Sequence, residues 1–351
     1  MVAAALRFWR LDLIQFLHDE ATQVWTARAV AAGELVTRGN ATSLHVPLPP
    51  GGPYLLALPA LVSSHPALFA GFVVVLQMVS LSVMGRVTAQ KFGGAAGLWA
   101  MGLAAISPYL VHTSRILYPF ALLPVFGAYL YKWLLDDRPR WGALAALGAA
   151  GALIQPLFLV PVLVAAVVLR FGGRPPVRAL GRETSPSLQT SSRPGGVGSQ
   201  GLTAAAPLAA GLLIAGLWLP YLIDLAGEGF GPLAPGLTSV RNLVTLEPGR
   251  VFGWDALRHA GGWLTTADVP HLVGDVGAVF GRGAWLVPAL ELAGVALVLY
   301  GLARMWRNRR QDSSSYRVAL WSAGTLGLLW LLPIGKMHSY LTVFYPAPFV
   351  L

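Results

Sequence analysis

Cysteine is absent from the 351 residues, so disulfides and thiolate metal sites are excluded. Charge is also scarce: Lys, Arg, Asp and Glu make up 11% of the chain, whereas soluble domains carry about 25%. The net charge of +10 does not indicate a nucleic-acid partner. The Lys and Arg residues fall mainly in short loops between apolar runs, as they do in the cytoplasmic loops of membrane proteins.

The chain is rich in long apolar runs. Its residues are 55% hydrophobic and its mean hydropathy is +0.62. Several runs reach about 18 residues, the length at which a helix crosses about 30 Å of hydrocarbon. The sequence therefore predicts an all-α fold, a polytopic transmembrane helical bundle with about nine or ten spans when short and truncated ones are counted.

The run 141–169 is too long for a simple crossing, because as one helix it would measure about 43 Å. Basic residues flank it on both sides, so a single crossing would place one basic flank outside. We therefore predict a hairpin of two short helices, broken near Gln155–Pro156 and Pro161. The other predicted spans are 66–85, 94–111, 116–135, 202–223, 284–303, 318–335 and a last one that begins near Leu341.

The chain divides into three predicted regions. Residues 1–170 form a membrane core with a polar, Pro-rich outer loop at 11–64, in which 19–33 and 54–62 are predicted helices. Residues 171–200, rich in Arg, Ser, Gly and Pro, are predicted to form a cytoplasmic linker. Residues 201–351 add further transmembrane helices and a second outer loop at 224–283. Both ends of the chain are apolar, so we expect a first helix mostly upstream of Met1 and a cut C-terminus.

Loop charge predicts the orientation of the bundle. Positive residues concentrate on the cytoplasmic side of membrane proteins. When the basic loops are placed inside, the acidic pair Asp19–Glu20 and Arg115 all lie outside. The residues that set this orientation are Arg86, Lys91, Arg138 and Arg140.

The Asp19–Glu20 pair is the predicted catalytic centre. A carboxylate can act as a general base for an incoming hydroxyl group. Neighbouring side chains on a helix diverge by about 100°, so the two carboxylates can serve different purposes. The pair could instead complement the positive end of a helix dipole. His18 could join the pair at a metal ion, but no third ligand lies at a useful spacing, so a divalent metal is allowed but not indicated.

Cations at the same membrane face could stabilise a departing phosphate through charge-assisted hydrogen bonds. The candidates for binding a donor phosphate are Arg115, Lys336 and His45, and those for binding substrate include His338 and Tyr340. Each has an alternative role: Arg115 as an interfacial anchor, Lys336 as a snorkelling side chain, His338 and Tyr340 as packing or belt residues. Glu291 lies inside a predicted span and is left out of the site.

A series of short motifs follows the same order as in a known family. The motifs are Leu6-Arg7-Phe8-Trp9-Arg10-Leu11, His18-Asp19-Glu20-Ala21, Pro47-Leu48-Pro49-Pro50, Ile106-Ser107-Pro108-Tyr109, Thr113-Ser114-Arg115-Ile116-Leu117-Tyr118, and His338-Ser339-Tyr340 before Tyr345-Pro346. In this order the chain resembles the GT-C membrane glycosyltransferases, in particular the family 39 group of protein O-mannosyltransferases and aminoarabinose transferases. The resemblance covers residues 6–170 well and residues 170–335 weakly.

The resemblance implies specific roles. Asp19 would be the base that activates the acceptor, with Glu20 as its neighbour, and the donor would be a polyprenyl-phosphate sugar. Arg115 would approach the donor phosphate, and Tyr118 would contact substrate. Family members often carry Lys before the Pro-Pro-Leu segment, whereas here His45-Val46 precedes Pro47, which shifts the phosphate contact towards His45, Arg115 and Lys336.

The hypothesis is an inverting glycosyltransferase that requires no cofactor. It would pass a sugar from a polyprenyl-phosphate donor to a hydroxyl group of a lipid, glycan or protein acceptor. Membrane lipids are further partners, and the predicted location is the bacterial plasma membrane with the site on its outer face. The alternative is a lipid or sugar transporter or flippase that forms no bond; it predicts charged residues on broken helices at mid-membrane.

Overall fold

A computed structural model describes residues 1–11, 16, 18–41, 46–136, 140–171, 205–234, 238, 286–307 and 313–331. Within these ranges the regular elements are helices, and the one extended pairing is an isolated bridge between Ala41 and Pro47. The predicted all-α fold is confirmed. The predicted linker and most of the second outer loop lie outside the described residues.

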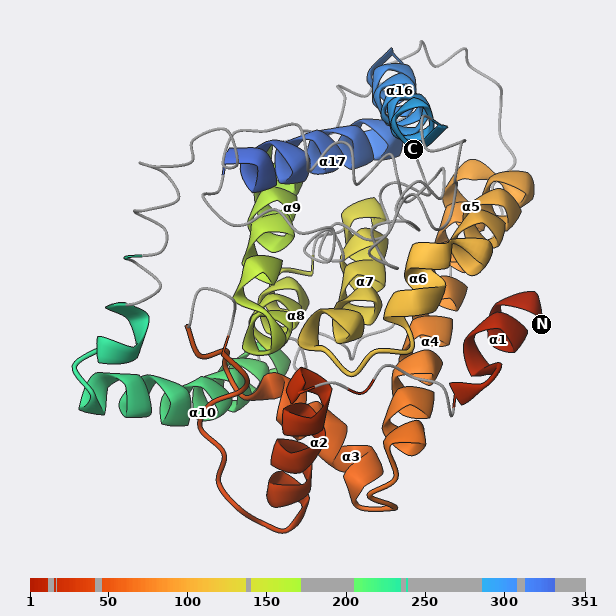
Figure 1. Cartoon of the computed structure of the whole chain (residues 1–351). Coiled ribbons are helices and arrows are strands. Elements are labelled where there is room, and N and C mark those ends of the chain that lie inside the picture. Colours follow the sequence, from red (N-terminus) through yellow and green to blue (C-terminus); the bar gives the residue numbers. More distant parts are fainter. Residues whose placement is uncertain are drawn as a thin grey trace, which may run out of the picture.

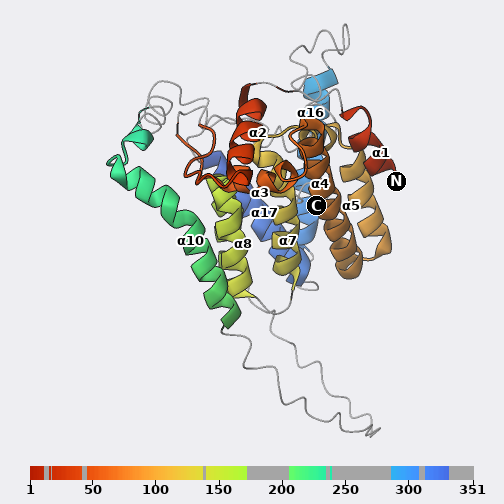
Figure 2. The same cartoon turned by 90° about the horizontal axis from the view of Figure 1, so that it is seen from below.

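The long helices pack together in a bundle (Figures 1 and 2). They are α4 (Pro66–Phe92), α5 (Gly94–Ile106), α7 (Leu123–Leu135), α8 (Trp141–Ile154), α9 (Leu159–Phe171), α10 (Ala205–Gly227), α16 (Leu286–Arg307) and α17 (Ser313–Leu331). Two stretches of the described chain, Pro66–Phe92 and Pro288–Arg307, are long and apolar enough to cross a membrane by length and composition.

Three shorter helices lie near one end of this bundle (Figures 1 and 2). They are α1 (Val2–Phe8), α2 (His18–Ala31) and α3 (Gly51–Ala60). The predicted helices 19–33 and 54–62 correspond to α2 and α3. The C-terminal ends of α4 and α7 lie at the opposite end of the bundle from α2 (Figure 2), and Arg86 and Lys91 belong to the last two turns of α4.

A tight hairpin joins α4 and α5. Gly93 makes the turn with φ +97°, a conformation that L-residues with side chains rarely adopt. Beyond the turn, a Cβ at Gly97 would lie 2.5 Å from the Cβ of Ala89 and 2.6 Å from the carbonyl oxygen of Gly85. Small residues thus let the two backbones approach closely, as in helix pairs within membranes.

Two proline residues divide spans that were predicted to be continuous. The span 94–111 is α5 followed by the short helix α6 (Pro108–Thr113), because Pro108 removes a backbone donor and disfavours helical geometry at Ser107. The span 116–135 is the 3₁₀ turn η2 (Pro119–Leu122) followed by α7. The non-helical segment 114–118 between these breaks carries Arg115 and Tyr118.

The predicted hairpin in the run 141–169 is confirmed with its break at Gln155–Pro156, whereas Pro161 lies within the first turn of α9 and does not interrupt it. Helix α8 ends at Ile154, Gln155 is extended with ψ 111°, and the 3₁₀ turn η3 (Pro156–Phe158) leads into α9. Side chains of α9 and η3 fill the space above glycines of α8: a Cβ at Gly148 would lie 2.8 Å from Val162 Cγ1, and one at Gly151 would collide with the Phe158 ring.

The buried core lies between α4, α7, α8 and α9 and contains a few satisfied polar groups. Gln77 of α4 is 2% exposed and donates from Nε2 to the Ala121 carbonyl, 2.8 Å away. Thr88 of α4 and Tyr131 of α7 share a hydrogen bond of 3.2 Å. The bond from Gln77 fixes η2, and with it the end of the segment that carries Arg115 and Tyr118.

Candidate active site

Helix α2 separates the two carboxylates of the predicted catalytic pair. Asp19 and Glu20 are both in its first turn, where negative charge complements the helix dipole. The Asp19 side chain is exposed, whereas Glu20 is 6% exposed. In Figure 1 the first turn of α2 is the one nearest the bundle. Because Asp19 is exposed, its carboxylate is accessible to an incoming hydroxyl group. The buried carboxylate of Glu20 suits a structural role instead.

Asn40 holds the backbone of Asp19 from the loop that follows α2. Its side-chain Nδ2 donates to the Asp19 carbonyl at 2.9 Å, and Asn40 is 7% exposed. The backbone of this loop is paired in turn: Gly39 N donates to Leu48 O at 2.7 Å, and Leu48 N donates to Asn40 O at 2.9 Å. Asp19 is thus linked to a paired loop segment as well as to its own helix.

Gln23 lies one turn after Glu20 on the same face of α2. It is 1% exposed, and among the residues that the structure describes neither its Oε1 nor its Nε2 has a hydrogen-bond partner. A Cβ at Gly52 would lie 3.5 Å from Gln23 Oε1 and 3.7 Å from Pro119 Cγ. The start of α3 and the start of η2 therefore lie close to Gln23 on the buried face of α2, and η2 directly follows the segment 114–118 in the chain.

Arg115 is held at the end of α6 by the N-terminal segment. Its Nη2 donates to the carbonyl of Arg10, while its Nε is buried and unpartnered within the described part of the chain. Arg10 has φ 49°, a left-handed conformation that is uncommon for a residue with a side chain. Such conformations cluster at functional sites, because the surrounding structure must enforce them. Here the bond from Arg115 contributes to holding Arg10.

His112 adds little positive charge near Arg115. Burial, and after it the positive charge of Arg115, lowers the pKa of His112 below its usual value. A lowered pKa favours the neutral form of the imidazole. Arg115 carries the positive charge of this segment.

Arg7 anchors α1 to the last turn of α5, close in the chain to Arg10. The side chain is fully buried, and its guanidinium donates to the carbonyl of Ala105 at 2.7 Å and to that of Ala104 at 3.1 Å. These carbonyls belong to the last turn of α5, whose acceptors lack partners within the helix and whose dipole favours a cation. Arg7 thereby fixes the end of α1 and the position of Arg10.

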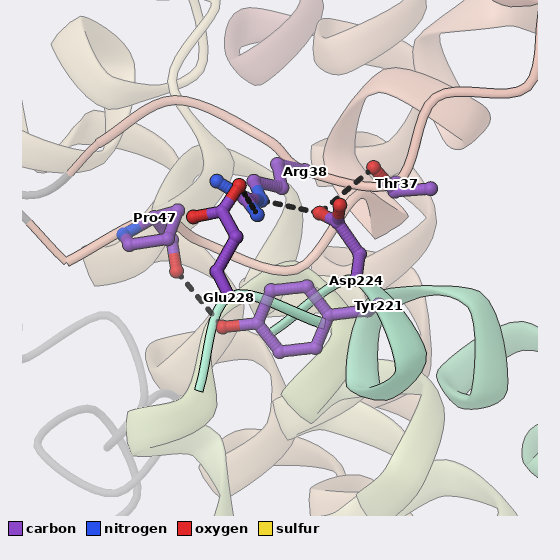
Figure 3. A network of polar contacts seen from close by, with 6 residues as sticks. All are labelled: Thr37, Arg38, Pro47, Tyr221, Asp224 and Glu228. Carbon is purple, nitrogen blue, oxygen red and sulfur yellow. Dashed lines mark hydrogen bonds and ion pairs between the residues drawn. The ribbon is translucent and has the colours of Figure 1, made fainter. Parts of the chain in front are cut away.

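A polar network joins the first outer loop to α10, as Figure 3 shows. Arg38 forms ion pairs with Asp224, and with Glu228 at 2.6 Å. Thr37 Oγ1 donates to Asp224 at 3.0 Å, and Tyr221 donates from its hydroxyl to the Pro47 carbonyl at 3.0 Å. The hydrogen bond from Arg38 lowers the pKa of Asp224, and the bonds to Glu228 and Asp224 raise the pKa of Arg38. Because Asn40 follows two residues later, the network connects α10 to the Asp19 backbone.

Only part of the predicted site lies within the described residues. Asp19, Glu20, Arg115 and Tyr118 belong to the described residues, and the Tyr118 ring packs against Phe120 with centroids 4.8 Å apart. The other predicted site residues lie outside the described residues: His45, Lys336, His338 and Tyr340. Glu291 lies on α16, and its side chain also falls outside.

Several residues of this arrangement were missed by the sequence analysis. Asn40 and Gln23 are single polar residues with no motif around them, so only their contacts identify them. The ion pairs of Arg38 could have been anticipated from the sequence. Arg38 lies in the first predicted outer loop, and its partners Asp224 and Glu228 lie in the second, on the same side of the membrane. Among the described residues, no group of three or more His, Cys, Asp or Glu side chains could hold a metal ion.

No family model and no curated protein matches this sequence. Among solved structures, the chain is similar to the crystal structure of ArnT from Cupriavidus metallidurans bound to undecaprenyl phosphate, with a TM-score of 0.54 and 13% sequence identity over 99% of this chain. It is similar to the apo state of the same ArnT as well, with a TM-score of 0.53 and 15% identity. In both cases the match covers 57% of the ArnT chain.

At this level of identity the similarity shows the fold. The chain has a polytopic helical membrane fold like that of ArnT, which agrees with the predicted fold class. It spans a little over half the length of the ArnT chain, so the activity of a whole protein of that length does not pass to it by fold alone.

Proposed function

We propose that this protein is a membrane glycosyltransferase of the GT-C class that transfers a sugar from a polyprenyl-phosphate donor to a hydroxyl acceptor. The observation that carries the proposal is the exposed Asp19 in the first turn of α2, in a chain whose fold is that of a protein crystallised with undecaprenyl phosphate. The separation of exposed Asp19 from buried Glu20 supports a division of roles within the pair.

In the proposed reaction Asp19 accepts the proton of the acceptor hydroxyl group. The acceptor oxygen forms a bond to the anomeric carbon as the bond from that carbon to the phosphate oxygen breaks. Polyprenyl phosphate leaves with the electron pair of the broken bond and the added negative charge. Attack opposite the leaving phosphate inverts the configuration at the anomeric carbon.

The leaving phosphate requires a cation, and Arg115 is the described candidate. Arg115 is half-buried at the end of α6, and its Nη2 donates to the Arg10 carbonyl, which orients the guanidinium. Guanidinium groups bind phosphate through charge-assisted hydrogen bonds that stabilise the charge developed in the transition state. Lys336 and His45 remain proposed contributors to the same contact, and His338, Tyr340 and Tyr118 to substrate binding.

The finer assignments are part of the same proposal. We place the protein in the bacterial plasma membrane with Asp19 on the outer face, and keep the family 39 resemblance as the finer class. The acceptor is a lipid, glycan or protein hydroxyl group. Loop charge supports the orientation, because Arg86 and Lys91 lie at the opposite end of the bundle from α2.

The proposal is tested by transfer of radiolabelled sugar in proteoliposomes that contain the full chain. Donors on polyprenyl phosphate are compared with the same sugars as nucleotide conjugates, and products are separated from unreacted donor. The expected result is a new glycosidic product from polyprenyl-phosphate donors alone. Movement of donor lipid across the bilayer without any new bond would support a flippase instead and overturn the proposal.

A further inference from the structure

A groove of about 620 Å³ runs along one side of helix α4, between α1 and α7. Figure 1 shows α4 between these two helices. The wall on α4 extends from Val75 to Gln90, which is about 22 Å at 1.5 Å per residue. This length exceeds one leaflet, about 15 Å of hydrocarbon.

One part of the groove is apolar and open. Val75 is 50% exposed and Val79 is 39% exposed, and they follow one another at helical spacing with Met78 and Val83 beside them. Phe8 of α1, which is 44% exposed, adds an aromatic ring to this apolar part of the groove. A wall of this kind fits a hydrocarbon chain that lies along the helix.

The other part is polar and positively charged. Arg86 and Gln90 of α4 face Tyr129 and Lys132 of α7, near the ends of both helices. The lining contains no Asp or Glu, and within the described ranges neither Arg86 nor Lys132 forms an ion pair. Two unpaired cations beside an amide and a phenol provide donors for an anionic headgroup.

We propose that this groove binds a phospholipid with an anionic headgroup, its phosphate held by Arg86 and Lys132 and one acyl chain lying along Val75–Val83. The basic part of the groove lies near the C-terminal ends of α4 and α7, at the end of the bundle opposite α2, and none of the residues that line the groove belongs to α2, so the proposal does not depend on the proposed sugar transfer. Charge complementarity favours an anionic headgroup, because basic residues beside transmembrane helices attract anionic lipids.

The test is a lipid titration of the purified full-length chain in detergent, followed by native mass spectrometry. The probes are phosphatidylglycerol and phosphatidylcholine with the same acyl chains. Phosphatidylglycerol is expected to bind more tightly, and the double variant Arg86→Gln/Lys132→Gln is expected to weaken its binding about 30-fold, since each cation near an anionic lipid contributes about a factor of five. Val79→Trp, which leaves the charges intact, is expected to weaken it by blocking the apolar wall.

The matched control is Arg140→Gln/Arg304→Gln, which removes two exposed cations that do not line the groove and should leave the affinity unchanged. Equal affinity for both phospholipids, or an unchanged affinity in the groove variants, would overturn the proposal. A third probe, undecaprenyl phosphate, separates the sources of the phosphate: Arg86-dependent binding of this lipid alone would assign the groove to polyprenyl phosphate. Absence of any bound lipid in the wild type would also overturn the proposal.

Discussion

Asp19 and Glu20 are neighbours in the sequence, yet their side chains have different surroundings. The first turn of α2 directs Glu20 to the buried face that also contains Gln23, and leaves Asp19 exposed. The backbone of Asp19 is fixed by the amide of Asn40. The proposed base is therefore an accessible carboxylate on a fixed backbone, which is the arrangement that proton abstraction from a positioned hydroxyl group requires.

Asn40 is a positioning residue in this account, which makes Asn40→Ala informative. Removal of one buried hydrogen bond should lower the free energy of unfolding by about 1 kcal/mol. Displacement of Asp19 should lower kcat by about 10- to 100-fold while KM for the donor changes little. Steady-state transfer assays and thermal unfolding in detergent measure the two effects. Glu34→Ala, at an exposed acid beyond α2, serves as the control. An unchanged kcat together with a lower Tm would restrict Asn40 to a structural role.

At the level of elements, the loop that follows α2 contacts both helix α10 and the start of α2. Thr37, Arg38 and Pro47 bind α10, and Asn40 binds the start of α2 (Figure 3). A displacement of the end of α10 would therefore be transmitted to Asp19 through a few residues of paired backbone.

Charge reversal tests this attachment. Arg38→Asp should lower transfer activity because it places three carboxylates together, and Asp224→Arg in the same chain should restore part of that activity by re-forming the pair in the opposite sense. The measurement is transfer rate at matched expression. If the double variant is no better than Arg38→Asp alone, the ion pair does not carry the effect.

The same pair predicts a pH dependence. The hydrogen bond from Arg38 lowers the pKa of Asp224, so its contribution to stability is fully present above the ordinary value of 3.8 and is lost as the pH falls through the lowered pKa. The difference in Tm between wild type and Asp224→Asn should be largest near neutral pH and shrink below pH 3.8. A difference that persists unchanged at lower pH would contradict the assigned cause.

The α4–α5 hairpin offers a direct test of packing. Gly97→Ala places a methyl group 2.5 Å from the Ala89 side chain, and overpacking of this kind costs about 1–3 kcal/mol. Gly102 lies on the same helix with nothing within 4 Å, so Gly102→Ala should leave the protein at least as stable. Thermal unfolding of the two variants decides the matter: equal Tm values would contradict the close approach of the two backbones.

For the whole molecule, the sequence was sufficient for the fold class and for much of the element order. Apolar runs and loop charge are local signals, and they predicted α4, the α8–α9 hairpin and the all-helical membrane fold. Pro108 and Pro119 were visible too, but the apolar residues around them suggested continuous spans. The proline effect on the preceding residue overrode that pattern and produced the separate segment 114–118.

The candidate site was less predictable than the fold. The Asp19–Glu20 pair stands out because two adjacent acids are rare in a chain with so little charge. Which of the two is exposed depends on how α2 packs against α3 and η2, a matter of tertiary contact. The partners Asn40 and Arg38 are ordinary loop residues, and their contacts reach Asp19 at a separation of 21 positions and Asp224 at 186 positions. No local pattern encodes such pairings.

The central claim is that the chain forms a glycosidic bond with Asp19 as base. The most direct measurement compares sugar transfer from polyprenyl-phosphate donors by wild type, Asp19→Asn and the control Glu34→Gln in membranes at matched expression. The account predicts transfer by wild type and by Glu34→Gln, and a rate about 100- to 10,000-fold lower for Asp19→Asn, the loss expected when a general base is removed. Transfer by Asp19→Asn at the wild-type rate would contradict the assignment of the base, and absence of transfer by the inserted, stable wild type would contradict the enzyme.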